Sequence, residues 1–90
     1  MISRILQIKT YSFDLINTKD IEYQKEFGKH LKKLREDKGI SQEELANISD
    51  VSLPQITRIE RGVLNTTLGT IKALAKGLNI KTAELFAFED

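Results

Sequence analysis

The stretch that most constrains this 90-residue chain is residues 41–62, which reads as two short helices joined by a tight turn. Ser41 is a suitable N-cap, because its hydroxyl can accept a hydrogen bond from a free N–H group of the first helical turn. Glu44, three residues later, completes a capping box. Asp50 stands where the chain must reverse, and aspartate tolerates the left-handed backbone better than most residues. These residues predict a helix from Ser41 and a turn at Asp50.

The second helix of this stretch opens with the same kind of pattern, Ser52 followed by Gln55. Ile56 and Ile59 lie three residues apart and form one apolar stripe, and Gly62 is placed to end the helix. Two capped helices separated by so short a turn form a helix-turn-helix. In such a motif the second helix enters the major groove of DNA.

The composition is that of one small globular domain, with 30% charged and 40% hydrophobic residues. There is no cysteine, which excludes disulfides and thiolate metal sites and fits a cytoplasmic location. No apolar run is long enough to span a membrane, and we expect no signal peptide. The net charge is only +1, but residues 25–81 hold eleven Lys and Arg against seven Asp and Glu. The charge alone does not indicate a nucleic-acid partner, so the prediction that the chain binds DNA rests on the helix-turn-helix motif.

Residues 1–17 differ from the rest because they are rich in β-forming and large apolar side chains. Their alternation is imperfect but predicts a short strand. A single strand in a helical chain has no partner. It could pair with its copy in a second subunit, pack loosely or be disordered, and we favour pairing because an unpaired apolar strand invites association. We therefore expect an N-terminal extension over 1–17, a possible dimerisation strand, and a DNA-binding domain over 18–90.

Three further helices are predicted around the central motif. The first begins near residue 18 and ends at Gly39, the next is capped by Thr67, and a short fifth helix starts near Thr82. The chain is therefore expected to be all-α, with five helices. Periodicity predicts a core of Leu31, Leu34, Leu45, Ala46, Ile56, Ile59, Leu68, Ile71, Leu74, Leu78 and Leu85.

The sequence resembles the phage-repressor/Cro-like helix-turn-helix family, also called the xenobiotic-response-element (XRE) family. The resemblance is carried by GISQEELA at 39–46 and by Ile56 and IERG at 59–62, in the same order and at the same separation, and it extends from about Phe27 to Phe86. It implies a five-helix lambda-repressor-like bundle. Ser49 stands where the family usually has an apolar or small side chain. We expect Ile48 to compensate by rotating toward the core.

The resemblance also implies which residues meet DNA. Base contacts are expected from the outward positions of the second motif helix, which are Leu53, Pro54, Gln55, Thr57 and Arg58. Arginine pairs with guanine, glutamine pairs with adenine, and apolar groups touch the thymine methyl. Leu53 and Pro54 stand where several family members carry polar side chains, which shifts weight toward apolar contact and DNA shape. Phosphate contacts are expected from Gln42, Ser52, Arg61, Asn65 and Thr66.

Two other expectations concern charge and chemistry. The resemblance implies a structural ion pair between Arg35 and Glu60 across the bundle, so Glu60 is read as structural rather than catalytic. The only histidine, His30, has no cysteine or second histidine beside it, and we interpret it as a surface or boundary residue. No catalytic residue, metal site or cofactor is predicted.

These observations support two functions from different classes. The first is a sequence-specific transcriptional regulator, a repressor in its simplest form, that binds double-stranded DNA as a homodimer on a palindromic operator. The alternative is an antitoxin-like subunit that binds a protein partner through residues 1–17, with secondary or no DNA binding. An enzyme is a distant third, and no membrane partner is expected.

Overall fold

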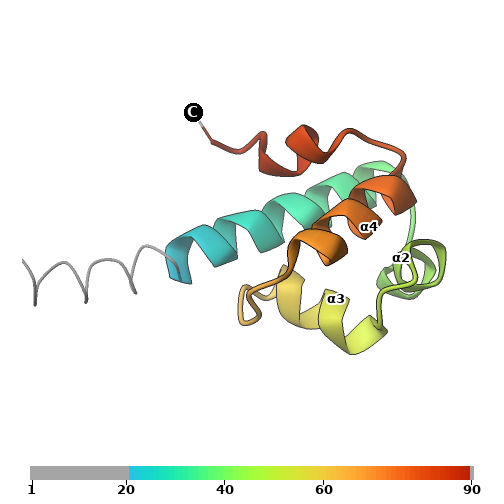
Figure 1. Ribbon diagram of the computed structural model, residues 1–90, viewed down its shortest axis with the longest axis horizontal. Helices are drawn as coiled ribbons and strands as arrows, with labels where there is room; N and C mark the ends of the chain where they lie inside the picture. The colour runs from blue at the N-terminus through green and yellow to red at the C-terminus, as the bar shows by residue number, and fades with distance from the viewer. Residues whose placement is uncertain (1–20, 90) are drawn as a thin grey trace, which may run out of the picture.

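In this computed structural model, the described residues are 21–89, and within them all regular secondary structure is helical (Figure 1). An N-terminal helix covers 21–37 of the described part. It is followed by α2 (Gln42–Ser49), α3 (Leu53–Glu60), α4 (Leu68–Leu78) and the 3₁₀ helix η1 (Thr82–Phe86). The prediction of five α-helices is therefore wrong for residues 21–89, because the last element is a short 3₁₀ helix. The strand predicted within 1–17 and the domain boundary at 18 lie outside the described residues.

Side-chain caps begin the three central helices. The Ser41 hydroxyl accepts from the Glu44 N–H at 3.0 Å, and the Glu44 carboxylate accepts from the Ser41 N–H at 3.0 Å, which confirms the capping box. At α3 only half of the predicted box forms. Ser52 accepts from the Gln55 N–H at 3.3 Å, but its hydroxyl takes the Gln55 side chain as a partner. Thr67 caps α4, as predicted.

Residues in the left-handed conformation end these helices. Asp50 has φ 56° and ends α2, as predicted, while Gly39 and Gly62 have φ 71° and 75° at the predicted ends of their helices. At the end of α4 the left-handed residue is Asn79, with φ 57°, and not a glycine. Gly77 lies one residue before the last residue of the helix.

The core forms where α2 packs against α3 and α4, and α4 packs against η1. Most of the predicted core residues are buried or packed at its edge, together with Phe27 and Val51. Leu68 is the clear error, since 84% of it is exposed. It is the first residue of α4, directly after the Thr67 cap, and the helix reaches the core only one turn later, at Ile71 and Leu74.

The expected inward turn of Ile48 is also wrong, because 57% of Ile48 is exposed and Ser49 is buried in its place. The Ser49 hydroxyl donates to the Leu45 carbonyl oxygen at 2.6 Å, which satisfies it inside the core. A Cβ added to Gly77 would come within 2.9 Å of the Ser49 Cβ. The two small residues therefore allow α2 and α4 to approach closely.

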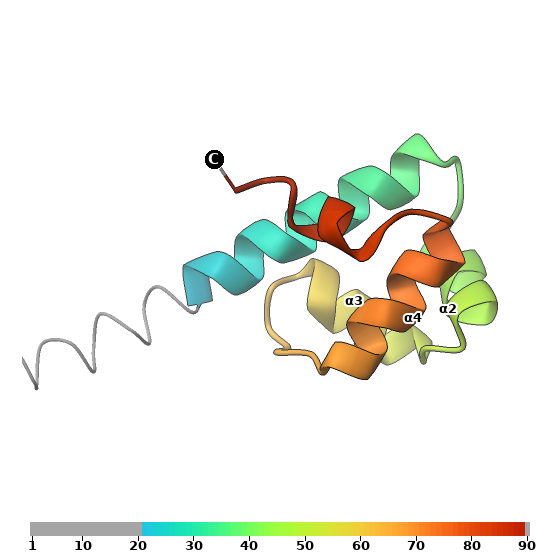
Figure 2. The same ribbon diagram turned by 45° about the horizontal axis from the view of Figure 1, so that its top comes forward.

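The chain after α4 is held against the N-terminal helix, and Figures 1 and 2 both show η1 beside that helix. The His30 Nε2 donates to the Glu84 carbonyl oxygen at 2.8 Å, and the rings of Phe27 and Phe86 lie 5.2 Å apart. Phe88 packs against His30 at 5.6 Å between ring centroids. His30 is therefore a half-buried boundary residue that fastens η1 to the N-terminal helix. Within 21–89, no helix has the length and apolar character that a membrane crossing requires.

Candidate nucleic-acid interface

One side of α3 faces the core and the other faces solvent. Ile56 and Ile59 are almost completely buried, at 0% and 1% exposure, and they hold the helix against the bundle. In Figure 1, α3 lies at the lower edge of the bundle while η1 lies at the upper edge. Leu53, Pro54 and Arg58 are exposed. None of the described residues covers this outer side.

The five residues expected to contact bases differ in their exposure and in whether their side chains already form hydrogen bonds. Leu53, Pro54 and Arg58 are exposed, whereas Gln55 and Thr57 are half-buried. The Gln55 side chain is already engaged with the Ser52 hydroxyl at the helix cap. Leu53 and Pro54 occupy the first turn of α3, where the N–H that proline lacks would have no helical acceptor. The structure thus brings an arginine and two apolar side chains to the surface of one helix.

A buried ion pair lies directly behind this helix. The Arg35 guanidinium donates to both oxygens of Glu60, at 2.7 and 2.9 Å, and also to the Ile40 carbonyl oxygen at 2.9 Å. Each of the two charged residues is only 8% exposed. The hydrogen bond to Glu60 raises the pKa of Arg35 above its ordinary value, against the opposing effect of burial. In this structure both oxygens of the Glu60 carboxylate are therefore engaged by the Arg35 guanidinium inside the bundle.

The Gln42 side chain is committed to this same region. Its amide nitrogen donates to Glu60 Oε1 at 2.8 Å, and its amide oxygen accepts from the Thr57 hydroxyl at 3.1 Å. Thr57 was expected to touch a base and Gln42 to hold a phosphate, but in this structure the two side chains contact each other. The link between Gln42 and Thr57 had no signal in the sequence, because the residues are fifteen positions apart and belong to different helices.

The residues expected to contact phosphate fall into two groups. Ser52, Arg61 and Asn65 are exposed near the two ends of α3. Thr66 differs, because its hydroxyl oxygen is buried and has no hydrogen-bond partner in the described part of the chain. A buried hydroxyl cannot reach a phosphate unless the loop rearranges, so the geometry does not support a side-chain contact from Thr66.

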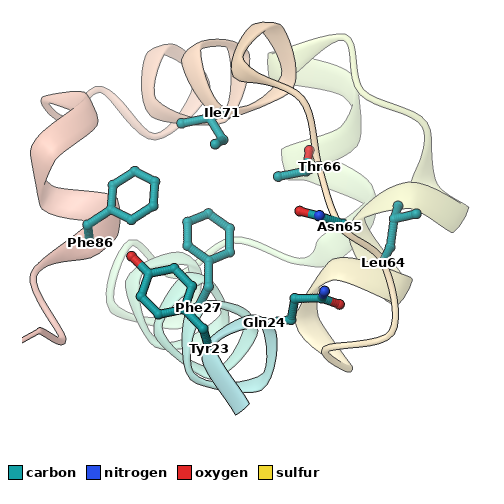
Figure 3. Close-up of a pocket in the computed structure, with 8 residues that line it drawn as sticks. All are labelled: Tyr23, Gln24, Phe27, Leu64, Asn65, Thr66, Ile71 and Phe86. Atoms are coloured by element: carbon teal, nitrogen blue, oxygen red, sulfur yellow. The ribbon is translucent and has the colours of Figure 1, made fainter. Parts of the chain in front are cut away.

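Thr66 and Asn65 line a small, mostly apolar pocket of about 120 Å³ behind the loop that follows α3 (Figure 3). Its other lining residues come from the N-terminal helix, the same loop, α4 and η1: Tyr23, Gln24, Phe27, Leu64, Ile71 and Phe86. Ligand-binding pockets are typically about 300–1,000 Å³, so this pocket is too small for a drug-sized ligand. Within 21–89, no group of His, Cys, Asp and Glu is placed to hold a metal ion.

Two carboxylates, those of Glu43 and Asp50, lie near the start of α3. Glu43 and Asp50 line a polar hollow between α2 and α3, together with Asn47, Ser52 and Gln55. By contrast, the positive charges of Arg58 and Arg61 are at the other end of α3. Neither arginine forms an ion pair with a carboxylate in the described residues. The charge along this side of the molecule therefore changes sign from one end of α3 to the other.

Taken together, two capped helices, a left-handed turn and an exposed second helix define a helix-turn-helix DNA-binding domain. A family model described as helix-turn-helix, HTH_3, matches residues 31–85, which is more than half of the chain. The chain belongs to this HTH_3 family, which confirms the resemblance that the sequence indicated.

Individual relatives agree with this assignment. The chain is 34% identical over 65 residues to the uncharacterized HTH-type transcriptional regulator y4dJ of Sinorhizobium fredii, covering 72% of this chain and 84% of the relative. Among solved structures, it is similar to the restriction-modification controller protein C.AhdI of Aeromonas hydrophila. That similarity has 41% identity and a TM-score of 0.69, and covers 70% of this chain and 96% of the other.

A further similarity is to an HTH_3 family transcriptional regulator of Vibrio cholerae, with 30% identity and a TM-score of 0.74. It covers 78% of this chain but only 39% of that larger protein. From the fold, the motif and these relatives, the protein is a helix-turn-helix transcriptional regulator.

Proposed function

We propose that this regulator binds a palindromic DNA operator as a homodimer, through the outer side of α3, and represses transcription by blocking access to the promoter. The observation that carries the proposal is that one side of α3 is buried in the core and the other is exposed. Ile56 and Ile59 fix the helix to the core while Leu53, Pro54 and Arg58 remain exposed. A helix held in this way can enter a major groove without moving relative to the rest of the fold.

The proposed base contacts follow from the chemistry of each side chain. Arg58 is the strongest candidate for direct reading, because its exposed guanidinium forms no ion pair within residues 21–89 and can donate two hydrogen bonds to guanine. Gln55 is proposed to meet adenine. Leu53, Pro54 and the methyl group of Thr57 are proposed to touch thymine methyl groups. With one arginine and three apolar groups, part of the specificity is expected to come from DNA shape.

The proposed phosphate contacts lie at the two ends of α3, which is the proposed reader helix. Ser52 is exposed at its start, and Arg61 and Asn65 are exposed beyond its end, so the three can fix the register of α3 on the duplex. Gln42 and Thr66 receive less support, since the amide of Gln42 is engaged inside the fold and the hydroxyl of Thr66 is buried.

The homodimer is proposed because helix-turn-helix proteins of this kind read two half-sites one helical turn apart, about 34 Å, with two copies of the reader helix. In this arrangement residues 18–90 form the DNA-binding domain and residues 1–17 contribute to the contact between subunits, in a cytoplasmic protein. The antitoxin-like alternative depends on residues 1–17, which lie outside the described residues, and no feature of 21–89 favours it.

Selecting bound sequences from a pool of random DNA duplexes tests this proposal. A regulator of this kind recovers one motif with two-fold symmetry and half-sites about ten base pairs apart. Recovery of a single unrepeated half-site would remove the dimeric part of the proposal. Recovery of no motif at all would contradict sequence-specific binding.

Replacing Arg58 with alanine tests the assignment of the strongest base contact. We expect Arg58→Ala to weaken binding to the selected site by about 1–3 kcal/mol and to leave binding to random duplex almost unchanged, because a bidentate base contact is lost. Arg61→Ala is the matched control, and it should weaken binding to both duplexes alike. Titrations of both variants on both duplexes measure this. Equal losses for Arg58→Ala on the two duplexes would make Arg58 a phosphate contact.

A further inference from the structure

We propose that Gln42 is a positioning residue, which transmits the orientation of the buried Arg35–Glu60 pair to Thr57 on the reader helix instead of holding a phosphate. This inference rests on the proposed function of α3 as the reader. The four side chains form one continuous series of hydrogen bonds. It begins at Arg35 inside the bundle and ends at Thr57, on the half-buried margin of α3.

For each hydrogen bond in the series, the chemistry of the groups allows only one choice of donor and acceptor. The Glu60 carboxylate can only accept, so the Gln42 amide must turn its nitrogen toward Glu60, at 2.8 Å. Its amide oxygen then faces Thr57, and the Thr57 hydroxyl must donate to that oxygen, at 3.1 Å. Glu60 Oε1 also accepts from Arg35 Nη2 at 2.9 Å. Because Arg35 carries a fixed positive charge, the direction of every hydrogen bond in the series is determined.

The arrangement has two consequences for DNA reading. First, Gln42 lies at the start of α2 and its two partners are one helical turn apart on α3, so its amide fixes the rotation of α3 relative to α2. Secondly, the Thr57 hydroxyl has already donated its proton and has none left for a base. Thr57 can then contribute its methyl group but not a donated hydrogen bond, which favours thymine at the base pair it faces.

The competing interpretation is that Gln42 binds a phosphate, and the two roles make opposite predictions. A phosphate contact contributes equally on every sequence and adds to the salt dependence of binding. A positioning residue acts through α3, so its loss should reduce the preference for the selected site over a scrambled one. The salt dependence should then stay the same.

Gln42→Met is the most informative variant, because methionine has a similar size but can neither donate to Glu60 nor accept from Thr57. We expect about a tenfold loss of affinity for the selected duplex, little change on a scrambled duplex, and an unchanged slope of log affinity against log salt. An equal loss on both duplexes, with a shallower slope, would overturn the proposal and make Gln42 a phosphate contact. No change on either duplex would also overturn it.

A double-mutant cycle with Thr57→Val makes the test specific to this pair. Valine keeps a methyl group at the same place but cannot donate to Gln42. If the two side chains act together, Gln42→Met should cost clearly less affinity in the Thr57→Val protein than in the parent. Fully additive losses would contradict the link. Unfolding curves for all four proteins show whether they are folded, and the ratio between the two duplexes is insensitive to a uniform loss of active protein.

The parent protein separates failure of this inference from failure of the proposed function. If the parent prefers its selected duplex and the cycle is additive, the inference is wrong and the proposed function stands. If the parent shows no preference for any duplex, both are wrong.

Discussion

Replacing Glu60 with alanine is expected to lower the free energy of unfolding by about 3–5 kcal/mol, because the change leaves a buried guanidinium without its carboxylate. Arg35 is only 8% exposed, and both of its hydrogen bonds to Glu60 would be lost, leaving the Ile40 carbonyl as its acceptor. The same change also removes the acceptor for the Gln42 amide. Small domains are stable by about 5–15 kcal/mol in total, so the variant should be partly unfolded near room temperature or have a much lower melting temperature.

Urea denaturation followed by circular dichroism measures this loss. The informative control is the double variant Arg35→Met, Glu60→Leu, which removes both charges and keeps apolar volume. Because a buried pair can often be replaced by apolar groups at little cost, the double variant should be much more stable than Glu60→Ala alone. If Glu60→Ala unfolds at the same urea concentration as the parent, the pair does not hold the bundle together.

Replacing Gly28 with alanine is expected to destabilise the domain by about 1–3 kcal/mol or more, because the new methyl group has no space. A Cβ on Gly28 would lie 2.2 Å from the Ile59 carbonyl oxygen and 2.8 Å from the Glu60 carbonyl oxygen. Both obstacles are backbone atoms at the end of α3, so the N-terminal helix must move away from α3 as a whole. The change should therefore also weaken binding to the selected DNA site.

Gly69→Ala is the matched control, since it makes the same substitution in another helix. Outside the backbone of its own helix, the nearest atom to the added Cβ is the Thr67 hydroxyl oxygen at 3.9 Å, which is an ordinary van der Waals contact. Alanine is favoured over glycine within helices by about 1 kcal/mol, and Gly69→Ala should be neutral or stabilising. Melting curves of the two variants compare them directly. If Gly28→Ala is as stable as Gly69→Ala, the helices are not in the close contact described here.

Local signals in the sequence predicted the central part of the fold correctly. The capping box at Ser41 and the left-handed turn at Asp50 depend on residues within three or four positions of one another. The same is true of the Ile56 and Ile59 stripe. Such interactions are decided by chain geometry before tertiary packing contributes, so residue type and spacing are enough to recognise them.

Features that depend on where a helix meets the core could not be predicted in this way. Leu68 continues the apolar stripe of α4, yet it is exposed because the first turn of that helix extends beyond the core. Ser49 is buried and Ile48 is exposed, and the close approach of Ser49 to Gly77, far along the chain, had no signal in the sequence. Periodicity gives the side of a helix that is apolar, but not how much of that side is covered.

In the candidate site, too, local features could be predicted from the sequence whereas long-range contacts could not. The exposure of Pro54 and Arg58 followed from their places opposite Ile56 in the isoleucine stripe. The contacts of Gln42 did not, because its partners lie fifteen and eighteen residues away. Nothing near Gly28 in the sequence indicated that the end of α3 rests against it. Long-range approaches of this kind become visible only once the helices are placed in space.

The salt dependence of binding to the selected duplex tests most directly whether the outer side of α3 is a DNA-binding surface. Our account predicts that affinity falls steeply between about 50 and about 200 mM salt, with a log–log slope of about −0.9 for each phosphate neutralised. It also predicts that Arg61→Ala makes that slope shallower by about one, whereas Lys72→Ala, an exposed lysine on α4, leaves it unchanged. An affinity that does not vary with salt, or a slope that Arg61→Ala leaves unaltered, would contradict the proposed interface.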